Sequence, residues 1–221
     1  MNPMKITLYF LCFLSLVAST PSHSQEKKTP PIPIEVLVGH RAIQFQAIVS
    51  RPLSASSPKW SYFGLTTYSS EYTNRADRNE FVALSFLNYG LSKHWKLAAG
   101  GSINHKTGFF PSMGVNFTWA NPTWLVVAFP RADLTGDHNL EMFGLTEFKP
   151  QVKPNWRLYN RVQWMYLHNP TEGHHARSFL QLRSGLQYKN FQVGAGYTAD
   201  WYGPSREFLG NAGLFGRVEI P

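Results

Sequence analysis

Residues 178–201 read SFLQLRSGLQYKNFQVGAGYTADW, and polar and apolar side chains alternate along most of this stretch. From Leu180 to Tyr188 every second residue gives LLSLY and the residues between them give QRGQ. From Phe191 to Trp201 the two sets are FVAYAW and QGGTD. A period of two, interrupted by Lys189-Asn190, predicts a β-hairpin. The polar set is too large for a soluble core and the apolar set ends in aromatic residues, which favours strands with one face toward lipid and one toward water.

The same alternation recurs from Ile43 to Ile220, where it predicts eleven strands with no helical run between them. Residues Ile34 to Val38 supply a twelfth, short strand. Because bacterial single-chain barrels have even strand numbers, the sequence predicts an all-β, antiparallel up-and-down transmembrane β-barrel of about 12 strands, with 10 strands as the alternative. A barrel of this size would be filled by side chains or have a narrow lumen.

The connections and the aromatic residues suggest how the barrel sits in a membrane. Tight turns are expected at every second connection, and therefore at one end, near Leu91, Asn121, Lys149 and Lys189. Short turns are typical of the periplasmic side, so longer loops, such as 71–79 and 168–177, are expected outside. Interfacial girdles are expected from aromatic residues near strand ends. These are Trp60, Tyr68, Trp95, Trp119, Trp156, Trp164 and Trp201.

The N-terminus has the pattern of an export signal. Lys5 precedes an apolar run from Ile6 to Ala18, which is too short to span a bilayer as a helix, and small residues follow it. We therefore expect residues 1–25 to be a signal peptide, 26–33 to be a flexible, proline-rich lead and 34–221 to form an outer-membrane barrel.

Composition fits this cell-envelope location and argues against nucleic-acid binding. Only 15% of residues are charged and 15% are aromatic, as expected where half of each strand is polar. The net charge is +8, but the basic residues are scattered, and an exported protein rarely meets nucleic acid. We expect outer-membrane lipids and lipopolysaccharide as partners, and the barrel-assembly machinery during insertion. Cys12, the only cysteine, would leave with the signal.

With these features in view, the chain resembles the small uncharacterised outer-membrane β-barrels of Bacteroidetes-type bacteria. The segments that carry the resemblance are Gly39-His40-Arg41, Phe129-Pro130-Arg131-Ala132-Asp133, Asn190-Phe191-Gln192-Val193-Gly194 and Asn211-Ala212-Gly213-Leu214-Phe215. The resemblance implies an outer-membrane barrel and no assigned activity. The final residues, Glu219-Ile220-Pro221, depart from the terminal aromatic residue common in barrel-assembly signals.

Charged residues fall on the faces predicted to line the lumen. Opposite charges on adjacent strands can pair and cross-link the walls. Such pairs would either plug the lumen, because a buried unpaired charge is costly, or form an ion-selective constriction. The candidate lumen charge network consists of Glu141, Glu147, Arg157, Arg161, Arg183 and Asp200.

The leading interpretation is a non-enzymatic outer-membrane barrel, either structural or a narrow pore for small solutes. The alternative is a lipid-modifying enzyme of the acyl hydrolase or acyltransferase type. A histidine two residues from a serine on one strand shares its face and can accept the hydroxyl proton, as in the outer-membrane phospholipase and lipid A deacylase families. Outside the signal there is no His-x-Ser pair, and the nearest match is His105-x-Thr107, close to the small residues 98–102. A soluble, lipocalin-like periplasmic binder is a third possibility.

Neither a metal site nor a cofactor site is predicted. The loop 168–177 contains four potential ligands, but its Pro170 and Gly173 indicate a solvated surface segment. We therefore assign no metal. The sequence has no P-loop, dinucleotide fingerprint or paired cysteine motif, so we expect no cofactor. The four potential ligands are His168, Glu172, His174 and His175.

Overall fold

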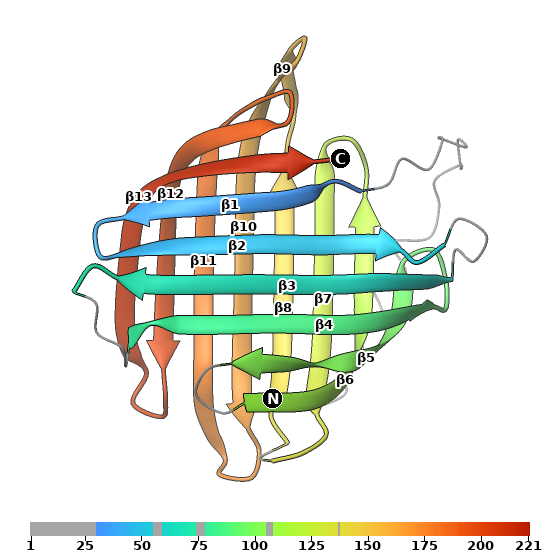
Figure 1. Ribbon diagram of the computed structural model, residues 1–221, viewed down its shortest axis with the longest axis vertical. Coiled ribbons are helices and arrows are strands. Elements are labelled where there is room, and N and C mark those ends of the chain that lie inside the picture. The colour runs from blue at the N-terminus through green and yellow to red at the C-terminus, as the bar shows by residue number, and fades with distance from the viewer. Residues whose placement is uncertain (1–29, 55–58, 74–77, 105–107, 137) are drawn as a thin grey trace, which may run out of the picture.

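The computed structural model describes residues 30–221, with gaps at 55–58, 74–77, 105–107 and 137 (Figure 1). The expected signal peptide and the His105-x-Thr107 pair fall outside the described residues. In the part of the chain that is described, no helix is both long and apolar enough to cross a membrane.

The described chain is a succession of antiparallel strands. They are β1 (Ile32–Gly39), β2 (Ala42–Pro52), β3 (Trp60–Glu71), β4 (Glu80–Gly90), β5 (Trp95–Asn104), β6 (Gly108–Ala120), β7 (Trp124–Asp133), β8 (Leu140–Phe148), β9 (Gln151–Lys153), β10 (Trp156–Asn169), β11 (His174–Tyr188), β12 (Phe191–Tyr202) and β13 (Glu207–Ile220). β9 has three residues and pairs only with the start of β10, so the other twelve strands form the wall. The predicted twelve strands are confirmed. β1 begins at Ile32, inside the segment expected to be a flexible lead.

These strands close into a barrel. Each wall strand pairs with the next along the chain, with β8 pairing directly with β10, and β1 pairs with β13 over eight positions. In Figure 1 the front strands β1 to β4 run across the back strands β7, β8 and β10, as expected when strongly tilted strands form opposite walls. Closure leaves no wall strand with an unpaired edge.

The barrel has two rims, which differ in whether they hold the ends of the described chain. The terminal rim is the end where β1 begins and β13 ends, and the far rim is the opposite end. All four turns that the sequence predicted to be tight lie at the terminal rim, as expected. Connection length does not separate the rims, however, because the far-rim connections 40–41 and 203–206 are as short as the terminal-rim connections 91–94 and 189–190.

The exterior is apolar. Leu182, Val193 and Tyr197 are 39%, 62% and 36% exposed, whereas Arg183 and Gln192, from the alternate positions of the same hairpin, are 4% and 1% exposed. The alternation predicted from residues 178–201 is therefore confirmed, with the apolar set outside and the polar set inside. A soluble binder of the lipocalin type would show the reverse arrangement, so this is the architecture of an outer-membrane β-barrel.

Aromatic residues gather at the rims, where membrane interfaces would lie. Four cross-strand ring pairs at the terminal rim have centroids 4.3–5.0 Å apart: Trp60–Tyr89, Trp95–Phe117, Trp124–Phe148 and Trp156–Tyr188. At the far rim, Trp201 contacts Phe208. Trp164 departs from the prediction, because it lies in the middle of β10, opposite Gly144.

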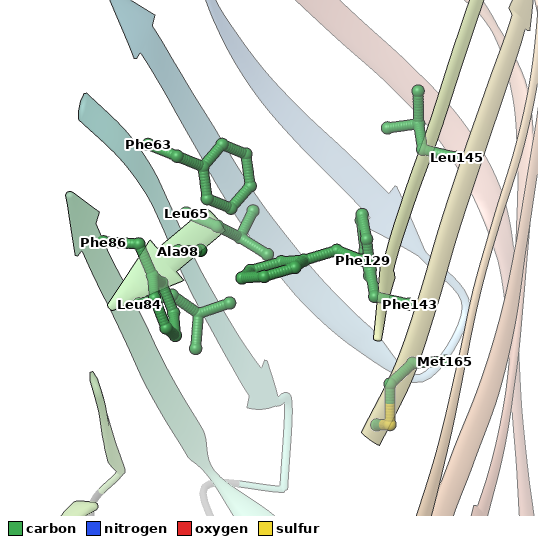
Figure 2. Close-up of a cluster of buried hydrophobic side chains, with 9 residues drawn as sticks. All are labelled: Phe63, Leu65, Leu84, Phe86, Ala98, Phe129, Phe143, Leu145 and Met165. Atoms are coloured by element: carbon green, nitrogen blue, oxygen red, sulfur yellow. The ribbon is translucent and has the colours of Figure 1, made fainter. Parts of the chain in front are cut away.

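Part of the interior is apolar, contrary to the expectation of a polar inner surface. Phe129 of β7 extends toward Phe63 of β3 and Phe86 of β4, with ring centroids 5.8 and 5.0 Å away and rings nearly perpendicular (Figure 2). This geometry is the edge-to-face arrangement that aromatic rings favour. The apolar cluster fills the lumen beside β3 to β8 and consists of Phe63, Leu65, Leu84, Phe86, Ala98, Phe129, Phe143, Leu145 and Met165.

Candidate functional site

A layer of buried ion pairs crosses the lumen beside the apolar cluster. Glu35 of β1 accepts hydrogen bonds at Oε1 from Arg161 of β10 at 2.7 Å and from Arg183 of β11 at 2.8 Å. Arg161 and Arg183 are direct cross-strand neighbours, so two like charges stand side by side on the wall. β1 pairs with neither β10 nor β11 in the sheet, so the Glu35 side chain reaches both arginines across the lumen. This carboxylate offsets the repulsion between the two arginines.

A second ion pair continues the layer. Glu147 of β8 pairs with Arg217 of β13 at 2.5 Å, and Tyr159 of β10 donates its hydroxyl hydrogen to the same carboxylate oxygen at 3.3 Å. Arg217 also contacts the Tyr159 hydroxyl and lies over the Tyr159 ring, 5.0 Å from its centroid. We call these residues the barrier layer: Glu35, Glu147, Tyr159, Arg161, Arg183 and Arg217. Each of them is at most 6% exposed.

The barrier layer separates two cavities of about 430 Å³ each. The first opens at the far rim and descends to Glu35, Gln163 and Arg183, which form its floor. The second lies at the terminal rim and includes Lys149 and Glu219. The two cavities share no lining residue, and four members of the barrier layer line neither. Within the described residues, it is therefore side chains of the wall strands that lie between the two cavities.

The mouth of the far-rim cavity is lined by further ion pairs. Arg177 lies 2.8 Å from Glu80 and 3.0 Å from Asp200. Arg131 binds both carboxylate oxygens of Glu141, at 3.0 and 2.6 Å, in the bidentate geometry that gives arginine–carboxylate pairs their specificity. These ion pairs fix the positions of the charged side chains at the mouth, and the same side chains line the cavity.

The structure divides the charges that the sequence grouped as one lumen network. Glu147, Arg161 and Arg183 belong to the barrier layer, whereas Glu141 and Asp200 lie near the far rim. Arg157 takes part in neither group, since it donates to the backbone oxygen of Pro122 at the terminal rim, at 2.6 Å. Arg161 and Glu147 are cross-strand neighbours, as their phase predicted, yet the ion pairs described above join each of them to a residue from a more distant strand.

Sequence reasoning missed the partners that complete these ion pairs. Glu35 and Arg217 hold the barrier layer together, and Arg131 and Arg177 hold the mouth. Each of them follows the inward phase of its own strand, so alternation alone could have identified them as lumen residues. In the barrier layer the pairing could not be predicted, because Glu35–Arg161 and Glu147–Arg217 join strands that are not neighbours in the sheet. At the mouth, Arg131–Glu141 and Arg177–Asp200 join neighbouring strands.

The structure also shows where the residues that suggested an enzyme or a metal site lie. Among the small inward residues 98–102, Ala98 packs into the apolar cluster with Phe86 and Phe129, whereas Ser102 lines the far-rim cavity. The loop expected at 168–177 is shorter in the structure, because β10 ends at Asn169 and β11 begins at His174. His174 pairs with Glu172 at 3.1 Å, while His175 bonds to the backbone oxygen of Gly203. Within the described ranges, no three His, Cys, Asp or Glu residues gather closely enough to hold a metal ion.

Comparisons with known proteins concern the fold alone. No protein-family model matches the chain, and no curated protein matches it. Among solved structures, the chain is similar to the KdgM porin at 7% identity with a TM-score of 0.46 and to the NanC porin at 12% identity with a TM-score of 0.48. It is also similar to LpxR from Salmonella typhimurium at 6% identity with a TM-score of 0.45. Each likeness covers 86% of this chain and 99% of the other.

Proposed function

We propose that this protein is a narrow outer-membrane channel for small solutes, in which the barrier layer limits passage. The observation that carries this proposal is the pair of cavities, one at each rim, separated by a few buried side chains. A wall of twelve paired strands does not move easily, whereas a layer of side chains can rearrange without disturbing the wall. The wall would therefore set the width of the pore, and the ion pairs would determine how often it opens.

The chemistry of the barrier layer favours rare or partial opening. A carboxylate held by two arginines in a buried position is stable only while the charges stay together, because a separated buried charge costs several kcal/mol. An entering anion can replace a carboxylate beside an arginine, and water can hydrate the exposed head groups from either cavity. We therefore expect small, brief conductance in place of the steady current of a wide porin.

The proposed orientation places the far rim outward and the terminal rim in the periplasm. Its support is the position of the predicted tight turns and of both ends of the barrel at the terminal rim. In this orientation the far-rim cavity would receive solutes from outside. Outer-membrane lipid and lipopolysaccharide would contact the apolar exterior, and the barrel-assembly machinery would insert the chain.

Single-channel recording in planar bilayers tests the proposal. The informative variant is the triple substitution Glu35→Ala, Arg161→Ala and Arg183→Ala, which removes three charges together and leaves none of these three groups unpaired. We expect larger and longer conductance events than in the unaltered protein. The matched control is the double substitution Arg41→Gln and Glu71→Gln, which removes a partly exposed pair at the mouth and should leave conductance unchanged.

The same recording can contradict the proposal. If both the unaltered protein and the triple variant are folded, as shown by heat-dependent gel migration, and neither conducts, the channel function is excluded. A structural role would then be favoured by the same ion pairs, acting as cross-links between opposite walls.

A further inference from the structure

A β-bulge near the far rim brings a histidine and a serine together. The register of β10 with β11 shifts at Leu167, where Arg177 is the partner, to His168, where His175 is the partner, so Ala176 is an extra residue on β11. In a regular strand, residues three positions apart lie on opposite faces. The extra residue reverses the phase and puts His175 and Ser178 on the same face. The spacing of the pair in the sequence is His-x-x-Ser, which differs from the His-x-Ser spacing of a regular strand.

The hydrogen bonds of His175 fix the roles of its two ring nitrogens. Nδ1 lies 2.8 Å from the backbone oxygen of Gly203, which can only accept, so Nδ1 carries the hydrogen. In the neutral imidazole, Nε2 then has the free lone pair, and it lies 3.0 Å from the Ser178 hydroxyl oxygen. A hydroxyl, a base within hydrogen-bond reach and a third group that orients the base are together the signature of an activated nucleophile.

The pair lies on the outer face of the barrel, where Ser178 is half-buried and His175 is 7% exposed. The residues on either side of Ser178, Arg177 and Phe179, line the lumen cavity, so Ser178 points the other way. Its cross-strand neighbours are Tyr166, which is 41% exposed, and Trp201. The Tyr166 ring covers the imidazole, with centroids 5.5 Å apart. Because aromatic residues mark membrane interfaces, we expect the hydroxyl near the depth of lipid ester groups.

We propose that His175 and Ser178 form a membrane-facing catalytic dyad that cleaves acyl esters of lipids in the leaflet at the far rim. Ser178 Oγ adds to the ester carbonyl carbon while its proton moves to His175 Nε2. The imidazolium returns this proton to the alcohol oxygen as the ester C–O bond breaks, which leaves an acyl-serine. Water, losing a proton to Nε2, then cleaves the acyl-serine, releases the fatty acid and restores the hydroxyl. The Gly203 oxygen positions the base.

A second serine on the same face of β11 provides a contrast. Ser184 donates its hydroxyl hydrogen to Asn160 Oδ1 at 2.9 Å. An amide oxygen satisfies the hydroxyl but is too weak a base to take its proton. Ser184 is therefore a matched control with the same strand, the same orientation and no base beside it.

An alkyl fluorophosphonate tests the dyad directly, because it phosphonylates an activated serine with loss of fluoride. The folded full chain in mixed micelles is treated with this reagent, and the modified residue is located by peptide mass spectrometry. We expect modification at Ser178 in the unaltered protein and in Ser184→Ala. Loss of the base in His175→Ala should slow it by about a hundredfold or more. Failure to modify Ser178 in the unaltered, folded protein would overturn the proposal even if a variant failed to fold.

Lipid cleavage tests the substrate class. Vesicles of phosphatidylethanolamine with radiolabelled acyl chains are incubated with the unaltered protein, Ser178→Ala and Ser184→Ala. We expect fatty acid from the unaltered protein and Ser184→Ala and none from Ser178→Ala. Equal release by Ser178→Ala, or cleavage of a soluble nitrophenyl ester without cleavage of the lipid, would overturn the assignment. The dyad lies outside the lumen, so this outcome is independent of channel conductance.

Discussion

Glu35 and Arg161 form a 2.7 Å ion pair across the lumen although 126 residues separate them in the chain. Both side chains are almost fully buried, and Arg183 shares the same carboxylate oxygen. The pair links β1 to β10 in the folded barrel, and neither arginine has a second carboxylate in the ion pairs of the described residues. We therefore expect both the stability of the barrel and permeation through the proposed channel to depend on Glu35.

Replacing this carboxylate should destabilise the barrel strongly. In Glu35→Gln two buried arginines lose their counter-charge, which for a broken buried pair costs about 3 to 5 kcal/mol. Urea unfolding in detergent micelles, followed by tryptophan fluorescence, measures the change. The control is Glu207→Gln, which removes a 2.9 Å pair with Arg78 at a site where Glu207 is about half exposed and should cost about 1 kcal/mol or less. Equal effects of the two substitutions would contradict the account of the barrier layer.

The barrier layer should make the channel prefer anions. Three arginines surround two glutamates there, so the narrowest region carries a positive excess. The reversal potential across a potassium chloride gradient should show chloride preference in the unaltered protein. Arg183→Gln should reduce that preference while Arg161 continues to pair with Glu35. A cation preference in the unaltered protein would show that other residues form the constriction.

The seam between β1 and β13 depends on close backbone contact. Gly213 lies opposite Gly39, and a Cβ atom at Gly213 would overlap the backbone oxygen of Val38. Backbone atoms in a paired strand cannot move aside, so Gly213→Ala should prevent the seam from closing. Gly216→Ala is the matched control on the same strand, because a Cβ atom there would meet nothing within 4 Å. Loss of heat-dependent gel migration in Gly213→Ala alone is expected, and a normally folded Gly213→Ala would refute the argument.

The apolar cluster should contribute to stability like a soluble core. Phe129→Ala removes a ring that is 1% exposed and packed against two others, which should cost about 3 to 5 kcal/mol in the free energy of unfolding. Phe191→Ala, at an outward position that is 59% exposed, should cost far less. Denaturant unfolding measures the free energy of unfolding of both variants. Similar decreases in the two would mean that the cluster is not a packed core.

The sequence predicted the architecture because side-chain alternation has the same period as the strand. Leu182 and Arg183 show this directly, one exposed and the other buried at adjacent positions. Eleven strands, the inward and outward faces and the common rim of the tight turns follow from that local rule, and the even strand number of bacterial barrels added the twelfth strand. Alternation did not predict the apolar lumen, because Leu84 and Phe86 face inward on a strand whose two faces are both apolar.

The candidate sites were harder to predict because they depend on contacts between distant strands. Glu35 meets Arg161 only after the barrel has closed, and no local pattern marks that encounter. The pair of His175 and Ser178 is a different case, since it is local but depends on one extra residue at Ala176. A bulge changes the period by one, and strict alternation assigns every residue beyond it to the wrong face.

The central claim, that the hairpin of β11 and β12 faces lipid with one set of side chains and the lumen with the other, is tested by fluorescence quenching in bilayers. Bimane is attached in a Cys12→Ser background at Val193→Cys or at Gln181→Cys, and the vesicles contain brominated acyl chains or aqueous iodide. The account predicts that bromine quenches the probe at position 193 and not the probe at 181. Quenching of both probes by iodide alone, or by bromine at 181 alone, would contradict it.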